Sequence, residues 1–393
     1  MDDGQTSEPS SVEADFTSKP WAAYIEASLG LCNYWYPACF ASEVPEDECL
    51  GVRLLGERIL LKRVGGRVHA VEDRCVHRGV SLSARPECYS ANTVTCWYHG
   101  FTYDVRDGKL VAIITDPESP LIGKAALKSY FVEERKNLVF VFIGDGEPTP
   151  LVESVQPGFL DDDLYIAPNG ARGVVKCNWR LAAENGVDAS HIYIHRNSKL
   201  LSAARRAVPL SSYFVSRDGM VVEIDGGPKG VVKGAGRKVS VWQTEVEGNT
   251  VATHYRPEDN PAGSAITDTS LWLPCGLKVD PFPTAGMIHF EWYVPIDETS
   301  HYYVVTWGKR VAGEAAQQQF AREVETHWKE LVVDHFNHDD VFAREEMERF
   351  YAEEDGWNRE RLFRPDVILT EWRKLASRCH RGIQRRQHPA PVR

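Results

Sequence analysis

The pattern of apolar and polar positions changes along the chain. From about residue 54 to residue 142, short runs rich in β-branched and aromatic residues are separated by glycine and proline, which is typical of strands. Gly65-Gly66 and Asp107-Gly108 are the expected hairpin turns. The pattern therefore predicts a small antiparallel β domain. Its main expected strands are Arg58–Arg63, Arg67–Val71, Thr93–Trp97, Phe101–Val105 and Leu138–Ile143.

Helices are expected on both sides of this β-rich stretch. Trp21–Cys39 has the pattern of a helix that is followed by an aromatic turn at Tyr34–Pro37. The glycines and prolines of Gly144–Pro150 are typical of a linker. Beyond the linker, Asn178–Ile194 is mostly helical in period and follows an expected strand at Gly173–Cys177.

The remaining chain is expected to contain several strands and one long charged helix. This helix spans about Ala315–Glu353 and has apolar residues at helical spacing. Gly230–Gly236 is rich in glycine but does not form a nucleotide fingerprint between a strand and a helix, so we expect no flavin or nicotinamide site on this chain. The expected strands are Met220–Ile224, Val239–Val246, Val251–Tyr255, Met287–Val294 and Tyr302–Trp307.

Composition narrows the range of possible partners. The 45 basic and 56 acidic residues give a net charge of −11, which argues against nucleic acid or an anionic membrane. No run approaches the ~20 apolar residues that a membrane span requires. Residues 1–20 lack the features of a signal peptide and are expected to be a disordered lead-in. Nine scattered cysteines do not suggest a disulfide framework, so we expect a cytoplasmic protein.

Two cysteine–histidine pairs carry the strongest chemical signal. Cys75 and His77 form the first pair, Cys96 and His99 form the second, and eighteen residues separate His77 from Cys96. A Rieske [2Fe–2S] cluster has two thiolates on one iron and two imidazoles on the other. The glycine that follows each histidine suits a tight loop that closes over a cluster. The sequence therefore predicts a Rieske [2Fe–2S] cluster on these four residues.

Two other classes of protein share some of these features. A structural zinc site uses the same ligand types, but zinc fingers pair cysteine with cysteine and histidine with histidine, whereas both pairs here are mixed. A Rieske protein that only transfers electrons would need about one domain. The long stretch 151–393 argues against that second alternative.

A second group of candidate metal ligands follows the linker. On one helix, Asp188, His191 and His195 would occupy positions i, i+3 and i+7 and share a face. Most pairs of histidines at this spacing bind no metal, but an electron-delivering cluster in the same chain needs an acceptor. Two imidazoles and a carboxylate form the facial triad of non-haem Fe(II) oxygenases.

The carboxylate is expected from Asn337–Val341 on the long helix. Asp340 lies four residues after Phe336 and seven before Met347, in register with an apolar face, so it is preferred over Asp339. Adjacent aspartates are also common on solvated helix faces, and that alternative remains open.

In combination, these motifs resemble the terminal oxygenase α subunits of Rieske non-haem iron aromatic-ring-hydroxylating oxygenases. The resemblance covers roughly residues 30–350 and includes Lys176–Trp179 and Glu184–His191. It implies an α+β fold of the helix-grip type. An all-β Rieske domain with an N-terminal helix would span 21–150, and a catalytic iron domain with an antiparallel sheet covered by helices would span 151–393.

The resemblance also implies roles for the candidate residues. Cys75 and Cys96 would hold one iron of the cluster, and His77 and His99 the redox-active one. The mononuclear Fe(II) would be held by His191, His195 and Asp340. In the family, the aspartate at the place of Asp188 joins a Rieske histidine of one subunit to an iron-binding histidine of its neighbour in a head-to-tail homotrimer. Here it would join His99 to His191.

The expected partners are separate electron-transfer proteins. Electrons would come from NAD(P)H only indirectly, through a ferredoxin reductase and a ferredoxin. Arg78 and Lys109 are candidates for the ferredoxin surface, although both also fit plain solvated charge. The substrate pocket is expected to be flat and apolar, with Gly186, Ile192, Phe282 and Phe336 as candidate lining residues, each of which also fits simple core packing.

The spacing of the two iron-binding histidines refines the expected activity. Three residues separate His191 from His195, whereas many family members have four. This spacing and Phe290–Pro295 are similar to the carbazole 1,9a-dioxygenase branch and its monooxygenase-like relatives. We therefore expect dihydroxylation of a polycyclic aromatic ring with O2 and two electrons, by angular dioxygenation of carbazole. A monooxygenase or demethylase is the alternative within the family.

Overall fold

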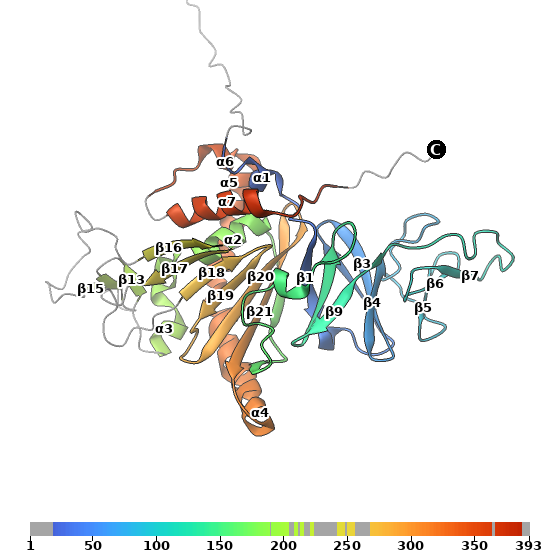
Figure 1. Ribbon diagram of the computed structural model, residues 1–393, viewed down its shortest axis with the longest axis horizontal. Coiled ribbons are helices and arrows are strands. Elements are labelled where there is room, and N and C mark those ends of the chain that lie inside the picture. Colours follow the sequence, from blue (N-terminus) through green and yellow to red (C-terminus); the bar gives the residue numbers. More distant parts are fainter. Residues whose placement is uncertain are drawn as a thin grey trace, which may run out of the picture.

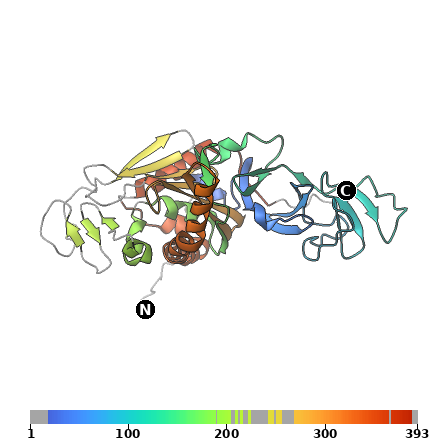
Figure 2. The same ribbon diagram turned by 90° about the horizontal axis from the view of Figure 1, so that it is seen from below.

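The computed structural model describes residues 19–188, 190–203, 208–210, 213–215, 221–223, 242–247, 250–255, 268–363 and 366–386. Residues 1–18 of the expected lead-in and the glycine-rich run 230–236 lie outside these ranges. The fold is α+β, as predicted, with a β-rich N-terminal part followed by a large antiparallel sheet that packs against helices (Figure 1). The two parts lie end to end along the long axis of the molecule (Figure 2).

Three small antiparallel sheets form the N-terminal part, with strand orders β1-β10-β9, β2-β3-β4-β8 and β5-β6-β7. The predicted strand Thr93–Trp97 is shorter than expected, because the strand ends at Thr95 and Trp97–His99 form a turn. The strands are β1 (Tyr34–Phe40), β2 (Cys49–Leu54), β3 (Glu57–Val64), β4 (Arg67–Glu72), β5 (Thr93–Thr95), β6 (Phe101–Asp104), β7 (Leu110–Ile113), β8 (Ser129–Tyr130), β9 (Val132–Arg135) and β10 (Leu138–Ile143).

The prediction of an aromatic turn at Tyr34–Pro37 was wrong. Helix α1 spans only Ala22–Glu26, and Tyr34–Pro37 begins strand β1, all of whose residues are buried. The strand pairs with β10, which is buried along its whole length, and Trp35 packs on Phe142 with ring centroids 5.6 Å apart. A strand that is buried on both faces shows no alternation of apolar and polar residues. Without that alternation, the pattern of residues contained no sign of a strand here.

One large antiparallel sheet forms the framework of the second part. Its strand order is β11-β21-β20-β19-β18-β17-β16, and β12 also pairs with β21. A separate small sheet contains β13 (Val208–Leu210), β14 (Tyr213–Val215) and β15 (Val221–Glu223). The strands of the large sheet are β11 (Leu164–Ile166), β12 (Ala171–Val175), β16 (Trp242–Glu247), β17 (Thr250–Tyr255), β18 (Asp268–Trp272), β19 (Gly276–Asp280), β20 (Met287–Asp297) and β21 (Ser300–Arg310).

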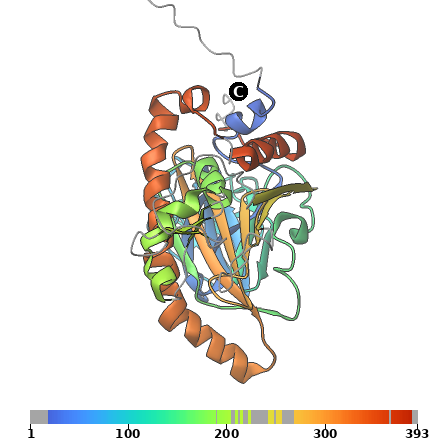
Figure 3. The same ribbon diagram turned by 90° about the vertical axis from the view of Figure 1, so that its left-hand side faces the viewer.

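The two long helices expected from the sequence are both interrupted. Instead of one helix over Asn178–Ile194, α2 (Trp179–Val187) ends and a separate 3-10 helix, η4 (His191–Asn197), follows. The expected helix Ala315–Glu353 consists of α4 and α5 with two π-helical segments between them, and this run extends beside the large sheet (Figure 3). The other helical elements are η2 (Ala41–Glu43), η3 (Leu151–Ser154), α3 (Lys199–Ala203), α4 (Glu314–Glu323), η6 (Val324–Trp328), η7 (Glu330–Asp334), α5 (Asn337–Glu353), α6 (Gly356–Arg359) and α7 (Val367–Cys379).

Backbone hydrogen bonds join the two parts of the molecule. The amide of Leu55, in the turn between β2 and β3, donates to the carbonyl of Pro295 at 2.8 Å, and Gly56 donates to Ile296 at 2.9 Å. Both acceptors lie near the end of β20, which lies between β21 and β19 in the large sheet. Among the described helices, none is long and apolar enough to cross a membrane.

A buried arginine joins helix α7 to helix α2. Arg373 on α7 is fully buried and bonds both carboxylate oxygens of Glu184 on α2, at 2.8 and 2.6 Å. Its guanidinium also bonds Glu360 at 2.5 and 2.9 Å. Because Glu184 is buried, removing the cation would leave its carboxylate without the positive charge that balances it.

We therefore expect Arg373→Leu to destabilise the protein by about 3–5 kcal/mol, the cost of breaking a buried ion pair. The measurement is the loss of structure in a chemical denaturation series. Lys374→Leu is the matched control, because Lys374 lies on the same helix and forms a partly exposed ion pair with Glu371. Equal unfolding midpoints for the two variants would contradict the structural role of Arg373.

Candidate metal centres

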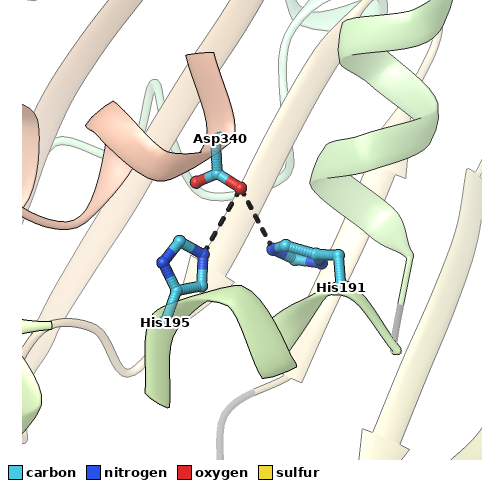
Figure 4. A group of neighbouring side chains, drawn as sticks. All are labelled: His191, His195 and Asp340. Atoms are coloured by element: carbon cyan, nitrogen blue, oxygen red, sulfur yellow. Dashed lines mark ion pairs between the residues drawn. The ribbon is translucent and has the colours of Figure 1, made fainter. Parts of the chain in front are cut away.

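Two histidines and one aspartate converge in the second part of the molecule. His191 and His195 lie on η4 and Asp340 lies on the first turn of α5. One carboxylate oxygen, Asp340 Oδ1, lies 3.4 Å from His191 Nε2 and 3.3 Å from His195 Nε2 (Figure 4). The candidate ligand atoms of the three residues all lie within 4.8 Å of one another.

The 3-10 geometry of η4 gives the two imidazoles their different directions. Helix α2 ends because Asp188 adopts an extended conformation with φ −63° and ψ 114°. In a 3-10 helix, residues four apart do not share a face, since the repeat is three residues. The rings of His191 and His195 accordingly lie at 86° to each other and reach Asp340 from two sides. The expected single helical face for Asp188, His191 and His195 is therefore wrong, although the convergence of the two histidines is real.

The electrostatics of this group fit a bound cation. His195 is fully buried, and neither of its ring nitrogens has a hydrogen-bond partner among the described residues. Burial alone would lower the pKa of His195, but Asp340 and Asp339 raise it to about 9. Burial would raise the pKa of Asp340, but His195, His191 and Arg344 outweigh that effect and hold it well below its ordinary value. Two imidazoles and one carboxylate with open positions are the ligand set of mononuclear non-haem iron.

The structure separates the two adjacent aspartates. Asp340 is 4% exposed and faces the Nε2 atoms of both histidines. The side chain of Asp339 is 40% exposed, and its Oδ2 lies 3.6 Å from His195 Nδ1, on the opposite edge of that ring. Asp340 is therefore positioned as a ligand, whereas Asp339 is positioned to orient the ring of His195.

Asp188 contacts His191 through its backbone. The Asp188 carbonyl accepts a hydrogen bond from His191 Nδ1, which leaves Nε2 of the same ring directed at Asp340. The Asp188 carboxylate accepts bonds from the amide and the hydroxyl of Ser190, both at 2.7 Å. In the single chain, the carboxylate does not reach either His191 or His99, so a bridging role between subunits stays a prediction.

The four candidate cluster ligands lie on two loops of the same shape. In each loop the cysteine carbonyl accepts from the amide four residues on, from Gly79 at 2.8 Å and from Gly100 at 2.9 Å. Both glycines have positive φ, +72° and +73°, a conformation that other residues rarely adopt. The matched turns leave Cys75 and Cys96 buried, as a cluster that is enclosed on its thiolate side requires.

The histidines of the two loops lie toward the surface. The rings of His77 and His99 are 4.6 Å apart between centroids, and His77 is exposed. Nδ1 of His99 is buried, and no described residue bonds it. Two buried thiols beside two adjacent imidazoles fit the asymmetric ligand set of a Rieske cluster.

The sequence reasoning missed Tyr103, which supports the cluster loops from β6. Its hydroxyl lies 3.3 Å from Cys75 Sγ and accepts from the amide of Val76 at 3.2 Å. Because the hydroxyl accepts that amide bond, its hydrogen is available to the Cys75 sulfur. A tyrosine three residues after the second glycine is the signal that could have indicated this contact.

Two of the candidate pocket residues lie beside the iron-binding group. Phe336 stacks on His195 with centroids 3.7 Å apart and planes at 10°, and Phe282 packs on Phe336 at 5.2 Å. Ile192 lies on η4, directly after His191, and is partly buried against the core. Gly186 is accounted for by packing, since a Cβ there would lie 2.0 Å from the hydroxyl of Tyr293.

A buried polar network next to this aromatic cluster was also missed. His289 packs on Phe282, and its Nε2 lies 2.5 Å from Glu291 Oε1. The hydroxyls of Tyr293 and Tyr303 both donate to Glu291 at 2.6 Å. Burial would raise the pKa of Glu291, but His289 outweighs that effect and lowers it. The alternation of His289, Glu291 and Tyr293 along β20 was the available signal, because alternate residues of a strand share a face.

The fold and the two metal-binding groups together define a Rieske-type non-haem iron oxygenase. Residues 34–130 match the Rieske [2Fe-2S] domain family, and residues 142–384 match the family described as homotrimeric ring hydroxylase. The chain therefore belongs to the Rieske aromatic-ring-hydroxylating oxygenases.

Particular relatives are similar over nearly the whole chain. The terminal oxygenase component of carbazole 1,9a-dioxygenase from Sphingomonas sp. is 49% identical over 94% of this chain and 97% of its own. The solved terminal oxygenase of carbazole 1,9a-dioxygenase from Novosphingobium sp. KA1 is 44% identical, has a TM-score of 0.81, and covers 94% of this chain and 98% of its own. A reduced complex between oxygenase and ferredoxin in carbazole 1,9a-dioxygenase matches with 39% identity and a TM-score of 0.80, over 96% of this chain and 97% of that chain.

Replacing Asp340 should remove one iron and leave the cluster intact. We expect the iron content of Asp340→Ala to be two per chain instead of three, because two imidazoles alone hold Fe(II) weakly. The two remaining irons belong to the [2Fe–2S] cluster. Iron analysis together with the visible spectrum of the cluster measures this. Asp339→Ala is the control and should keep the third iron when metal is in excess. Loss of the third iron in Asp339→Ala but not in Asp340→Ala would reverse the assignment.

Removing the Tyr103 hydroxyl should lower the reduction potential of the cluster. A hydrogen bond to a cluster sulfur stabilises the electron-rich reduced state, so Tyr103→Phe should be harder to reduce. A redox titration followed by the visible spectrum gives the midpoint. Tyr130→Phe is the control, because that hydroxyl donates to Glu57 in the same part of the molecule. An unchanged midpoint in Tyr103→Phe would show that the hydroxyl does not act on the cluster.

Proposed function

We propose that this chain is the terminal oxygenase of a carbazole 1,9a-dioxygenase. The observation that carries the proposal is the presence of two metal-binding groups in one chain, a pair of Rieske loops and a two-histidine, one-carboxylate group. An electron-transfer protein has no use for the second group. We place the boundary between the Rieske and catalytic domains within Gly144–Pro150, so that residues 151–393 form the catalytic domain.

Carbazole is the proposed substrate because the relatives that match nearly the full length of this chain are named for its oxidation. The aromatic surface beside the iron-binding group fits a flat polycyclic molecule. Phe336 stacks on His195, and Phe282 packs against Phe336. The proposed reaction adds two hydroxyls to adjacent ring carbons, one of which bears the nitrogen. The product then opens to an aminobiphenyl diol.

The residues of the chain prepare the site for this reaction. When bound, the cluster supplies electrons one at a time and the mononuclear iron activates O2. The Asp188 carbonyl accepts a hydrogen bond from the Nδ1–H of His191, which fixes the tautomer that leaves Nε2 free to bind metal. Phe336 covers the face of His195 and keeps water from that ring. The carboxylate of Asp340 balances the charge of a bound cation in a buried position.

Electron delivery is proposed to pass between subunits of a homotrimer. The family is described as homotrimeric, and exposed aromatic residues lie near both metal-binding groups. Trp97 and Tyr98 next to His99 are 37% and 48% exposed, and Tyr193 between the iron-binding histidines is 46% exposed. A neighbouring subunit that covered these side chains would bring His99 of one chain toward Asp188 of the next, where the carboxylate would join the two centres.

The electron donors are proposed to be a ferredoxin and its reductase. A solved relative has been captured with ferredoxin, and Arg78 and Lys109 are exposed on the Rieske part, Lys109 in an ion pair with Asp107. Because the electrons originate from NAD(P)H, we propose that the protein acts in the cytoplasm, where that reductant is available.

The deciding experiment is a single turnover of chemically reduced protein with carbazole under 18O2, followed by mass spectrometry of the product. No partner protein is needed, since one reduced cluster and one Fe(II) hold the two electrons. We expect two labelled oxygens in an aminobiphenyl diol. One labelled oxygen would show a monooxygenase instead. Unreacted carbazole with both metals in place would remove the substrate assignment and leave the oxygenase class.

A further inference from the structure

Two cysteines that are not cluster ligands lie in contact on the Rieske part. Cys49 Sγ and Cys88 Sγ are 3.8 Å apart. Cys49 opens strand β2 and is partly buried, whereas Cys88 is exposed. Forming a disulfide requires the two sulfurs to approach to about 2.0 Å. The contact already brings them close enough for small side-chain movements to complete that approach.

A buried lysine places a positive charge beside the exposed sulfur. Lys62 lies opposite Cys49 in the pairing of β2 with β3 and is fully buried. Its ammonium donates to the carbonyl of Thr93 at 3.0 Å and to that of Ser90, two residues after Cys88, at 3.4 Å. Lys62 is therefore held in place by the backbone of the segment that carries Cys88, where it can stabilise a thiolate.

The two sulfurs differ in acidity. A hydrogen bond from the Cys49 thiol lowers the pKa of Cys88, and Lys62 lowers it further against the effect of burial, to about 6. The same contact and burial raise the pKa of Cys49 well above its ordinary value. Burial also raises the pKa of Cys39, to about 12, and that of Cys177. Cys88 thus has the thiolate character and the access of a reactive cysteine, and Cys49 is the thiol in reach of it.

We propose that Cys49 and Cys88 are a modification site at which a hydroperoxide forms a reversible disulfide. The Cys88 thiolate attacks one peroxide oxygen, the O–O bond breaks, and hydroxide leaves, which gives a sulfenic acid. The Cys49 sulfur then attacks the Cys88 sulfur, the S–O bond breaks, and the Cys49 proton leaves with the hydroxyl as water. In total, two thiols and one hydrogen peroxide give one disulfide and two water molecules. A dithiol reductant reverses the reaction by thiol–disulfide exchange.

The disulfide would constrain the polypeptide segments around the two cluster loops. Glu87, next to Cys88, accepts a backbone bond from Thr95 at 2.7 Å, and Thr95 directly precedes the cluster ligand Cys96. Cys49 belongs to the neighbouring sheet β2-β3-β4-β8. The cross-link would therefore join that sheet to the segment between the two cluster loops. It would close a chain segment that contains Cys75, so it fixes one cluster loop relative to the other.

The test uses the full-length protein with its cluster in place. The reduced protein is treated with hydrogen peroxide, the remaining thiols are blocked with N-ethylmaleimide, and peptides are analysed without reduction. Cleavage by trypsin and a glutamate-specific protease isolates Cys49 on residues 49–53 and Cys88 on residues 88–106, so fragment ions distinguish Cys88 from Cys96. We expect a Cys49–Cys88 linked peptide that disappears after dithiothreitol, with an unchanged visible spectrum of the cluster.

Three variants test whether peroxide oxidises Cys49 and Cys88 specifically or oxidises exposed cysteines in general. Cys88→Ser should abolish the linked peptide, and Cys49→Ser should leave a sulfenic acid on Cys88 that dimedone traps. Cys379→Ser removes another exposed cysteine and should leave the linked peptide unchanged. The proposal is overturned if Cys88 is recovered as a blocked thiol under peroxide. It is also overturned if Cys88 is found linked to Cys96 with loss of the cluster spectrum. Neither result depends on the substrate of the oxygenase.

Discussion

The burial of the Asp340 carboxylate is the constraint on which the iron-binding half of the protein depends. An ionised carboxylate out of water is costly unless cations or donors surround it. Arg344, one turn later on α5, is 1% exposed and supplies a fixed positive charge on the same side of the helix. Its guanidinium lies over the rings of Tyr293 and Tyr303 and bonds Asn185 at 2.6 Å. The same residue therefore balances the charge of Asp340 and joins α5 to α2 and to strands β20 and β21.

The two metal-binding groups are built by different means. The cluster loops are local, because each places its ligands within a six-residue segment that has a glycine with positive φ and two backbone hydrogen bonds. The iron-binding group joins residues almost 150 positions apart, so its geometry rests on the packing of α2 against α5 and against the large sheet. This difference explains why the polar network of Glu291 and Arg344 lies under the iron-binding group. Tyr103 is a smaller support of the same kind, since it links β6 to the first cluster loop.

Irregular helical geometry appears where those ligands are presented. His191 and His195 lie on a 3-10 helix, and two π-helical segments precede the turn that presents Asp340. A continuous α2 would have placed both imidazoles on one face, and a continuous α4–α5 would have changed the direction of the carboxylate. π-Helical segments are rare and often occur at functional sites. Their position here agrees with that tendency.

The sequence by itself determined the α+β class, and it indicated the candidate cluster ligands and the two candidate iron-binding histidines. These follow from residue types at short, fixed spacings, and ligand chemistry restricts such spacings strongly. Only the tertiary structure decided that Tyr34–Pro37 is a strand, that both long helices are interrupted, and that Asp340 rather than Asp339 faces both histidines. Periodicity reports which side of an element is buried, whereas helix breaks, double burial and the direction of a side chain depend on contacts with distant parts of the chain. For the same reason, the sequence did not indicate the contacts of Tyr103, Glu291 and Cys88. Each of these side chains contacts a residue that only the fold brings near.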